Sequence, residues 1–367
     1  MRAVLLEGFG GVEKLRFVED FPKPEIREDE VLIRVKAVAL NHLDIWVRMG
    51  ALAVRPELPH ILGADISGVV ERVGSLVKDI KEGDEVVVAP GLSCGVCYEC
   101  QSGHDNHCRH YDILGLRSKG GYAEYVKVPA RNVIKKPSNL SFEEASSYPL
   151  TFLTVWNALV NKANIKPYHR VLIWGGSSGV GVAGIQIAKL FGAFVIATVG
   201  SEEKAKRCKE LGADVVIDHY KEDVVQRVRE LFKEGVDVVM DHVGSQTFWK
   251  SVECLRRGGR LVFFGTTTGS EAKIDIRSIE YTNQRIDETN QRIDETNKRI
   301  DQTRAELKEE IMQNTLRIDE LNRRVDELYI QLSHIRGDLN RALSQKEVIE
   351  DVLTRVQRLE LKVFGQL

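Results

Sequence analysis

The residues that break helices are confined to the first part of this chain. All nine prolines, all six cysteines and 28 of the 30 glycines precede Ile279, whereas residues 280–367 contain two glycines and no proline. Proline and glycine mark turns and loops, so a long stretch almost without them favours a continuous helix. The sequence therefore predicts a globular α/β body over residues 1–279 and one long helical segment over residues 280–367.

The globular body divides again near residue 150. Before that point, short β-rich runs alternate with turns, a spacing typical of an irregular antiparallel β domain. From residue 151 onward, predicted strands alternate with helical stretches, which indicates a parallel sheet with crossover helices. We therefore expect one domain over residues 1–150 and a second over residues 151–279.

The composition excludes several classes of protein. The chain carries 52 Lys and Arg against 54 Asp and Glu, a formal charge of −2, so no net basic field attracts nucleic acid or an anionic membrane. Its apolar runs are far shorter than the roughly 20 residues of a membrane span, and glycines interrupt the N-terminal run MRAVLLEGFGG too early for a signal peptide. We expect a cytoplasmic protein that binds neither nucleic acid nor membranes.

A glycine-rich loop follows the first predicted strand of the second domain. The strand at residues 170–174 leads directly into it and an amphipathic helix follows, the context that a dinucleotide fingerprint requires. There, glycines permit a tight turn and close approach of a pyrophosphate to the helix N-terminus; a plain strand–helix turn is the alternative. The candidate cofactor-binding residues of the loop are Gly175, Gly176, Ser178, Gly179, Val180 and Gly181.

The next predicted strand ends at residues 198–201 without an acidic residue. NAD-selective sites place Asp or Glu there to bind the ribose 2′-hydroxyl, whereas a small loop with Ser201 and a nearby Lys204 suits a 2′-phosphate. We therefore favour NADP, with NAD as the alternative, although Lys204 is nearly as well explained as a solvated helix residue. Val243 and Gly265 follow later strands, at the sheet edge where a nicotinamide should lie.

Four cysteines form the pattern C-x2-C-x2-C-x7-C within residues 94–108. In a cytosolic chain, closely spaced thiols are metal ligands more often than disulfides. Four thiolates complete a tetrahedral zinc shell and leave no open position for substrate, so this zinc would be structural; an iron–sulfur cluster or free thiols are the alternatives. The candidate ligands of one zinc per chain are Cys94, Cys97, Cys100 and Cys108.

Together, the order and spacing of these motifs over residues 1–279 resemble the medium-chain dehydrogenase/reductase superfamily of alcohol dehydrogenases and quinone oxidoreductases. The resemblance implies a GroES-like β domain with a structural zinc lobe, followed by a Rossmann nucleotide-binding domain. It also implies a small-molecule substrate, either a carbonyl compound or quinone, or an alcohol.

The catalytic zinc site of the alcohol dehydrogenases does not carry over to this chain. Matched to their pattern, the first cysteine ligand becomes Asn41 and the last becomes about Leu150. Neither residue supplies a thiolate, and an active zinc needs three protein ligands with an open position. The intervening His-Glu pair of the pattern becomes Ala64 and Asp65. A non-standard site would have to be built from His42, Asp44, His60 and Asp65.

The segment at residues 39–48 resembles instead the N-x-x-D segment of zinc-independent quinone oxidoreductases. The implied reaction is hydride transfer from NADPH to an enone or quinone. The resemblance implies that Asn41 contacts substrate or nicotinamide and that Asp44 orders the loop; a structural turn is the alternative for both. A zinc-dependent alcohol dehydrogenase is the second functional interpretation.

The helical tail carries heptad repeats. Isoleucine or leucine recurs every seven residues from Ile286 to Leu307, with threonine at the other seam position, and after a shift of four residues a Leu-rich seam runs from Ile311 to Ala342. Such a pattern predicts a coiled coil with one stutter, and hence a homo-oligomer. The tail stands where the family has a final segment that completes both domains, so a catalytically impaired chimera acting as a coiled-coil oligomer is a third interpretation.

Overall fold

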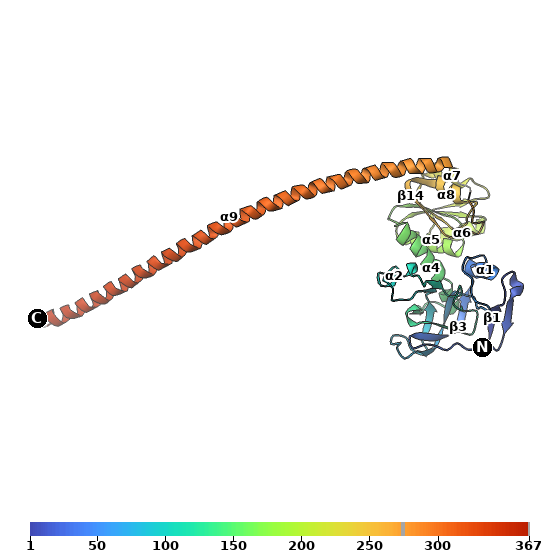
Figure 1. Cartoon of the computed structure of the whole chain (residues 1–367), viewed down its shortest axis with the longest axis horizontal. Coiled ribbons are helices and arrows are strands. Elements are labelled where there is room, and N and C mark those ends of the chain that lie inside the picture. Colours follow the sequence, from blue (N-terminus) through green and yellow to red (C-terminus); the bar gives the residue numbers. More distant parts are fainter. Residues whose placement is uncertain (273–275, 366–367) are drawn as a thin grey trace. The chain divides into compact units, whose positions relative to one another are not determined.

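The computed structural model describes the backbone of residues 1–272 and 276–365, and the side chains of residues 1–272, 293–362 and 365. The chain divides into two units, residues 1–272 and 273–367, and each is described by itself. Within the first unit, Figure 1 shows the antiparallel domain, which holds β1 and β3, and the parallel α/β domain, which holds α5 to α8.

The N-terminal domain is built around a five-stranded antiparallel sheet. Alternating valines and isoleucines of these strands face a core in which Ile33, Ile66 and Val86 are fully buried. In spatial order the strands are β8 (Tyr125–Pro129), β3 (Glu30–Ala39), β4 (Asp65–Val73), β5 (Glu85–Val88) and β9 (Val133–Lys135). Around this sheet lie β1 (Ala3–Leu6), β2 (Leu15–Val18), β6 (Gly91–Leu92), β7 (Asp112–Ile113), α1 (His42–Met49), α2 (Tyr98–Gln101), α3 (Phe142–Ser146) and the short 3₁₀ turns η1 (Val12–Lys14), η2 (Asp105–His107) and η3 (Ala130–Asn132).

The second domain is a five-stranded parallel sheet with helices on both faces. Its spatial order is β12 (Val215–Asp218), β11 (Phe194–Val199), β10 (Arg170–Ile173), β13 (Val236–Asp241) and β14 (Leu255–Phe263). The crossover helices are α5 (Gly179–Leu190), α6 (Glu202–Glu210), α7 (Val224–Leu231) and α8 (Phe248–Cys254). This is the Rossmann strand order, so the predicted Rossmann-type parallel α/β domain is confirmed.

Residue alternation along β10 explains the layers of this sheet. Val171 and Ile173 face a core shared with α5, whereas Leu172 and Trp174 face a core shared with α7 and α8. All four side chains are buried because both faces of a parallel sheet are covered by helices. The carboxyl end of β10, where Trp174 leads into the glycine loop, is therefore held from both sides.

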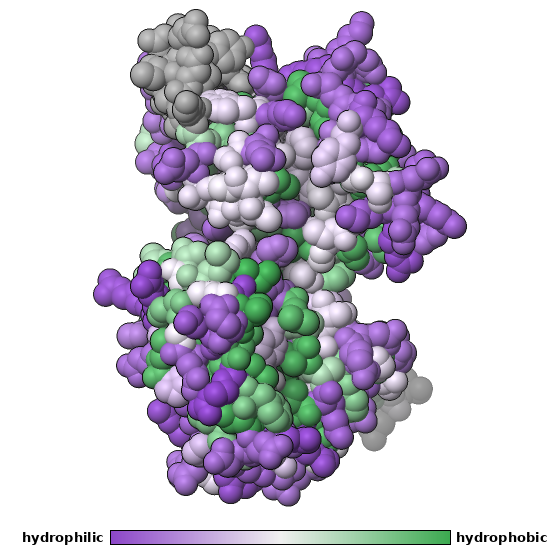
Figure 2. Space-filling view, turned by 90° about the vertical axis from the view of Figure 1, so that its right-hand side faces the viewer, coloured by the Kyte–Doolittle hydropathy of each residue, from purple (hydrophilic) through white to green (hydrophobic). Residues whose placement is uncertain are grey.

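Two consecutive helical segments join the domains. Helix α4 (Pro149–Val155) continues into a π-helix, η4 (Trp156–Lys162), so the connection is helical across the boundary expected near residue 150. A π-helix has a wider turn than an α-helix and is frequent at functional sites. The space-filling view in Figure 2 shows more hydrophobic surface over the antiparallel domain, in the lower half, than over the parallel domain above it.

The second unit is a single helix, α9 (Ile276–Phe364), which begins four residues before the predicted start at 280. Its large apolar side chains within residues 293–362 are exposed; Ile300 and Leu328 are 56 % and 57 % exposed. The predicted seam residue Ile286 lies outside the described side chains. No helix among the described residues has a hydrophobic stretch long enough to cross a membrane.

Candidate active site

The loop at residues 175–181 connects β10 to α5 in a tight turn. Gly175 has a φ of +61°, a conformation that favours glycine, and a Cβ on Gly181 would lie 2.2 Å from the Gly175 carbonyl oxygen. The amide of Gly175 donates to Thr198 Oγ1 at 3.0 Å, and the amide of Gly176 donates to the Thr198 carbonyl at 2.8 Å. The loop is therefore fixed against the carboxyl end of β11. Its glycines have no side chains that would keep a ligand away from the backbone.

Ser178 caps the helix that follows this loop. Its hydroxyl accepts a hydrogen bond from the Gly181 amide at 3.0 Å and donates to the Gly175 carbonyl at 2.7 Å. Gly179 and Val180 are then the first two helical residues, and first-turn amides have no partner inside a helix. The structure thus brings the six predicted loop residues to one helix N-terminus, and this cradle of amides and absent side chains fits the pyrophosphate of a nicotinamide dinucleotide.

Three residues lie at the neighbouring strand ends, on the same sheet edge. The predicted residues Val243 and Gly265 follow β13 and β14, and Gly265 approaches the backbone of His242 so closely that a Cβ would lie 2.9 Å from its carbonyl oxygen. No sequence motif pointed to His242; the one available signal was its place after a buried strand. Its Nε2 lies 3.0 Å from Ser178 Oγ, and its ring stacks beside Phe264 with centroids 6.2 Å apart.

A cationic cluster marks the far end of the loop region, after β11 and β12. Ser201 caps α6, accepting a bond from the Lys204 amide at 3.4 Å, and the Lys204 side chain is exposed. His219 and Tyr220, which sequence reasoning missed, stack with centroids 4.4 Å apart. Burial lowers the pKa of His219, the negative charge of Asp218 raises it, and the positive charges of Lys250 and Lys204 lower it. This cluster favours an anionic group.

Asn41 and Asp44 form the N-terminal cap of α1. The Asn41 amide donates to Asp44 Oδ2 at 2.7 Å, the Gly63 amide donates to Asp44 Oδ1 at 3.0 Å, and the Tyr122 hydroxyl donates to Oδ2 at 3.0 Å. Burial raises the pKa of Asp44, and these three hydrogen bonds act in the opposite direction. These bonds tie the cap of α1 to Gly63 and Tyr122.

Asp65 links this cap to the helix that leads into the second domain. Its Oδ2 accepts a hydrogen bond from Asn41 Nδ2 at 3.0 Å, and its Oδ1 accepts one from the Leu150 amide at 2.7 Å. The side chain is 1 % exposed, and burial raises its pKa to about 6 against these two bonds. The positions 41, 65 and 150, which the zinc resemblance pairs with metal ligands, are therefore joined directly by hydrogen bonds.

The non-standard metal site considered from the sequence does not assemble. His60 Nε2 lies 3.0 Å from the Gly115 carbonyl oxygen, His42 is exposed, and the carboxylates of Asp44 and Asp65 are occupied by the donors named above. Within the described ranges, the four-cysteine cluster is the only group of three or more His, Cys, Asp or Glu side chains that could hold a metal ion.

The four cysteines converge as their spacing predicted. Their sulfur atoms all lie within 4.8 Å of one another, with Cys97–Cys100 at 3.4 Å and Cys94–Cys100 at 3.8 Å. A tetrahedral site with Zn–S bonds of about 2.3 Å has sulfur atoms about 3.8 Å apart, so the donor set fits zinc. Hydrogen bonds from the amides of Val96 and Cys97 lower the pKa of Cys94 to about 6 and favour its thiolate, whereas the neighbouring thiols raise the pKa of Cys97 to about 11.

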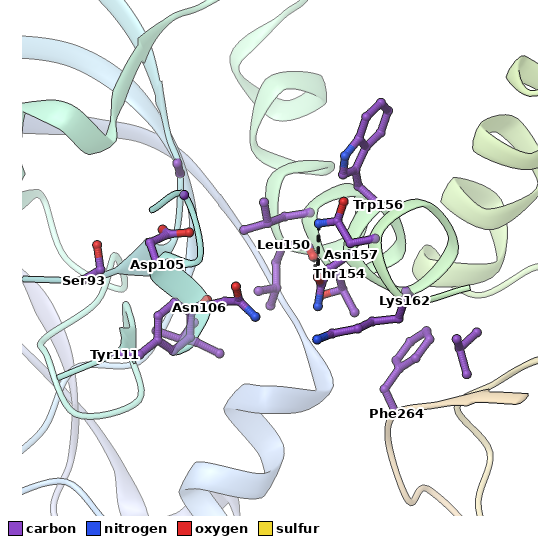
Figure 3. Close-up of a pocket in the computed structure, with 18 of the residues that line it drawn as sticks. Ser93, Asp105, Asn106, Tyr111, Leu150, Thr154, Trp156, Asn157, Lys162 and Phe264 are labelled. Carbon is purple, nitrogen blue, oxygen red and sulfur yellow. Dashed lines mark hydrogen bonds between the residues drawn. The ribbon is translucent and has the colours of Figure 1, made fainter. Parts of the chain in front are cut away.

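A cavity of about 720 Å³ is lined in part by Leu150, the residue whose amide donates to Asp65 (Figure 3). Ser93, Asp105 and Tyr111 line one side, and the helical segment with Leu150, Thr154 and Lys162 lines the other. Leu150 touches Asp65 through its amide, and the cavity residue Phe264 touches His242. The lining residues Leu150 and Phe264 are thus the ones in contact with the Asn41–Asp65 network and with His242, and the cavity volume suits a small organic molecule.

Two family models match the chain. An alcohol dehydrogenase GroES-like domain matches residues 27–138, and a zinc-binding dehydrogenase domain matches residues 179–298. The chain is 36 % identical over 276 residues to the NAD-dependent alcohol dehydrogenase of Sulfolobus acidocaldarius, covering 73 % of this chain and 78 % of the relative.

Solved structures show the same likeness. A crystal structure of an NAD-dependent alcohol dehydrogenase is 48 % identical with a TM-score of 0.73, over 77 % of this chain and 82 % of that chain. The quinone oxidoreductase of Escherichia coli, solved in complex with NADPH, is 32 % identical with a TM-score of 0.64, over 77 % of this chain and 78 % of that chain. The likeness thus includes both alcohol- and quinone-type enzymes.

Proposed function

The chain belongs to the medium-chain dehydrogenase/reductase superfamily, and from that premise we propose that it is an NADPH-dependent reductase of enones or quinones that works without a catalytic zinc. The observation that carries this proposal is the pair of hydrogen bonds from Asn41 Nδ2 and the Leu150 amide to Asp65. Asn41, Asp65 and Leu150 stand at positions that the zinc enzymes use for their metal site. Here these three residues hydrogen-bond to one another, and neither Asn41 nor Leu150 offers a thiolate.

A bound reduced nicotinamide supplies the hydride in this proposal, and the protein supplies position and electrostatics. The glycine loop and the α5 N-terminus hold the pyrophosphate, while Val243 and Gly265 border the nicotinamide. Asn41 faces the substrate carbonyl or the nicotinamide, and Asp44 keeps the loop of Asn41 ordered. A structural zinc on the four cysteines would fix the lobe at residues 94–108 and leave no position open for substrate.

We prefer NADP to NAD for this chain. Ser201, Lys204 and the stacked pair of His219 and Tyr220 lie where the adenosine ribose of a bound dinucleotide belongs, and no acidic side chain follows β11 directly to accept a bond from a 2′-hydroxyl. The positive charge there suits a 2′-phosphate. The homologue solved with NADPH is consistent with this choice.

The proposal is tested by turnover and zinc content together. NADPH oxidation by the purified full chain is measured with 2-cyclohexen-1-one and with 1,4-benzoquinone, and alcohol oxidation is measured with NADP and with NAD. We expect reductase turnover, no alcohol oxidation and one zinc per chain by elemental analysis. Asn41→Ala should lower kcat/KM for the reduction by about tenfold or more, whereas Leu40→Ala, at the exposed preceding residue, should leave it unchanged.

The outcome also separates the alternatives. Alcohol oxidation with two zinc ions per chain would establish the zinc-dependent alcohol dehydrogenase, which the 48 % identical structure favours. Nucleotide binding without any turnover would favour the catalytically impaired coiled-coil oligomer. In the reductase interpretation the chain acts in the cytoplasm, where its four clustered thiols stay reduced and available to zinc.

A further inference from the structure

The imidazole of His242 is placed to act on the cofactor loop. It follows β13, and its Nε2 lies 3.0 Å from Ser178 Oγ, the hydroxyl that caps α5. Because a hydroxyl has one hydrogen and Ser178 donates at the shorter distance of 2.7 Å to the Gly175 carbonyl, Nε2 is the donor in the contact with Ser178. Nδ1 is then the nitrogen that gains or loses a proton.

Both ring nitrogens of a protonated His242 would have acceptors nearby. Ser178 Oγ accepts from one, and the backbone carbonyl groups of Trp174 and Gly175 favour the charged ring. What opposes protonation is burial, which lowers the pKa of His242 from its ordinary value. The hydrogen bond to Ser178 and the nearby carbonyl groups thus favour an imidazolium, whereas desolvation, the largest influence on the pKa, and the charge of His42 oppose it.

The charged and titratable groups that act on His242 come from two elements. Asp241 of β13 favours protonation, but its carboxylate is fully buried and accepts hydrogen bonds from Thr247, Ser251 and the Val243 amide. His42 of α1 disfavours protonation when it is charged. Asp241 and His42 thus act on the ring in opposite directions, and a strong anion at the glycine loop would add a second negative charge that favours the imidazolium.

We propose that His242 takes up a proton from solvent when a dinucleotide binds, so that its imidazolium pairs with the pyrophosphate held at the glycine loop. This inference rests on the proposed nucleotide site. The pyrophosphate brings negative charge to the α5 N-terminus, one hydrogen bond away from the ring through Ser178. An opposite charge at that distance favours the charged form of histidine, so nucleotide binding and proton uptake are linked.

The linkage has a definite sign. Because the bound state holds a proton that the free state lacks, binding weakens as pH rises between the pKa of His242 in the free chain and its higher pKa in the complex. Within that window, the Kd should rise by up to about tenfold per pH unit. Outside the window, the Kd should no longer depend on this residue.

The test is isothermal titration calorimetry of the full chain with NADH and NADPH at pH 7, in MOPS and in Tris buffer, neither of which contains a phosphate that could compete for the glycine loop. These buffers differ in ionisation enthalpy, so the difference in observed heat gives the number of protons taken up. NADH is the decisive ligand because it lacks the 2′-phosphate, which itself titrates near this pH. We expect a substantial fraction of one proton per NADH in the unmodified chain and almost none in His242→Gln, whose amide can still donate to Ser178.

His169→Gln is the matched control, because His169 precedes β10 at the opposite end of the strand from the loop; it should keep the proton uptake. Equal uptake in the unmodified chain and His242→Gln, or none in either, would overturn the inference while leaving the nucleotide site intact. Failure of both nucleotides to bind would overturn the proposed function and the inference together. If His242→Gln does not fold, a Kd for NADH that stays constant from pH 6 to 8 in the unmodified chain would refute the linkage.

Discussion

Asp65 is almost completely buried, and ionising its carboxyl group therefore lowers the free energy of unfolding. Its two hydrogen bonds offset only part of this loss. Burial raises its pKa to about 6, whereas in an unfolded chain an aspartate titrates near 3.9. Between these two pKa values, the folded chain keeps the proton on Asp65 while the unfolded chain has lost it. Stability therefore falls as pH rises from about 4 to about 6, and the loss is complete above pH 6.

Replacing Asp65 by asparagine should remove this pH dependence while preserving the size of the side chain. Relative to Asp65→Asn, the free energy of unfolding of the unmodified chain should fall by about 1.4 kcal/mol per pH unit between pH 4 and pH 6. Urea denaturation of both chains across this range measures the difference. Asp79→Asn, at an exposed aspartate, is the control, and a constant difference for Asp65→Asn would contradict the assignment.

Single residues were predictable where a local motif specifies them. The glycine loop and the four cysteines are contiguous in sequence, and turn geometry or metal chemistry gives each residue a reason to be there. The contact of Asp65 with Leu150 joins residues 85 positions apart, and His242 meets Ser178 across 64 positions. No periodicity records such contacts, because they depend on how the sheets and helices pack.

The four-cysteine lobe is an element whose stability should depend on metal. It contains one four-residue helix and a 3₁₀ turn and is flanked by the two-residue strands β6 and β7, so it has little apolar core. Stripping zinc with a thiol reagent and chelator should lower the Tm by about 5 °C or more, measured by circular dichroism. Cys100→Ser should prevent the binding of one zinc per chain, whereas Cys254→Ala, at a buried thiol outside the lobe, should retain it. Full zinc content in Cys100→Ser would contradict this role.

The regular elements followed from their hydrophobic patterns. The parallel strands are short buried runs and the crossover helices are amphipathic, so their types were predicted correctly. The π-helix at Trp156–Lys162 was not predicted, since its wider turn arises in a segment whose composition is ordinary for an α-helix. It matters to the site because Trp156 and Lys162 line the cavity.

At the scale of the whole chain, α9 has a seam without a partner in the described part of the protein. Leu321, Leu328 and Ile335 recur at heptad spacing and are each more than half exposed, whereas paired helices would bury them. We expect sedimentation analysis to show a homo-oligomer. Replacing Leu321 and Leu328 together by aspartate should dissociate it, whereas Ser333→Asp, away from the seam, should not. A monomeric unmodified chain at micromolar concentration would refute the coiled coil.

The hydrogen bond between Asp65 and the Leu150 amide has a mechanical consequence. It fastens a strand of the antiparallel sheet to the first turn of α4, the helix that carries the chain toward the parallel sheet. A bond of fixed length tolerates rotation about itself far better than separation of its ends. Rotation of α4 about this bond would keep it intact, whereas separation of β4 from α4 would break it and leave a buried carboxylate oxygen without one of its donors.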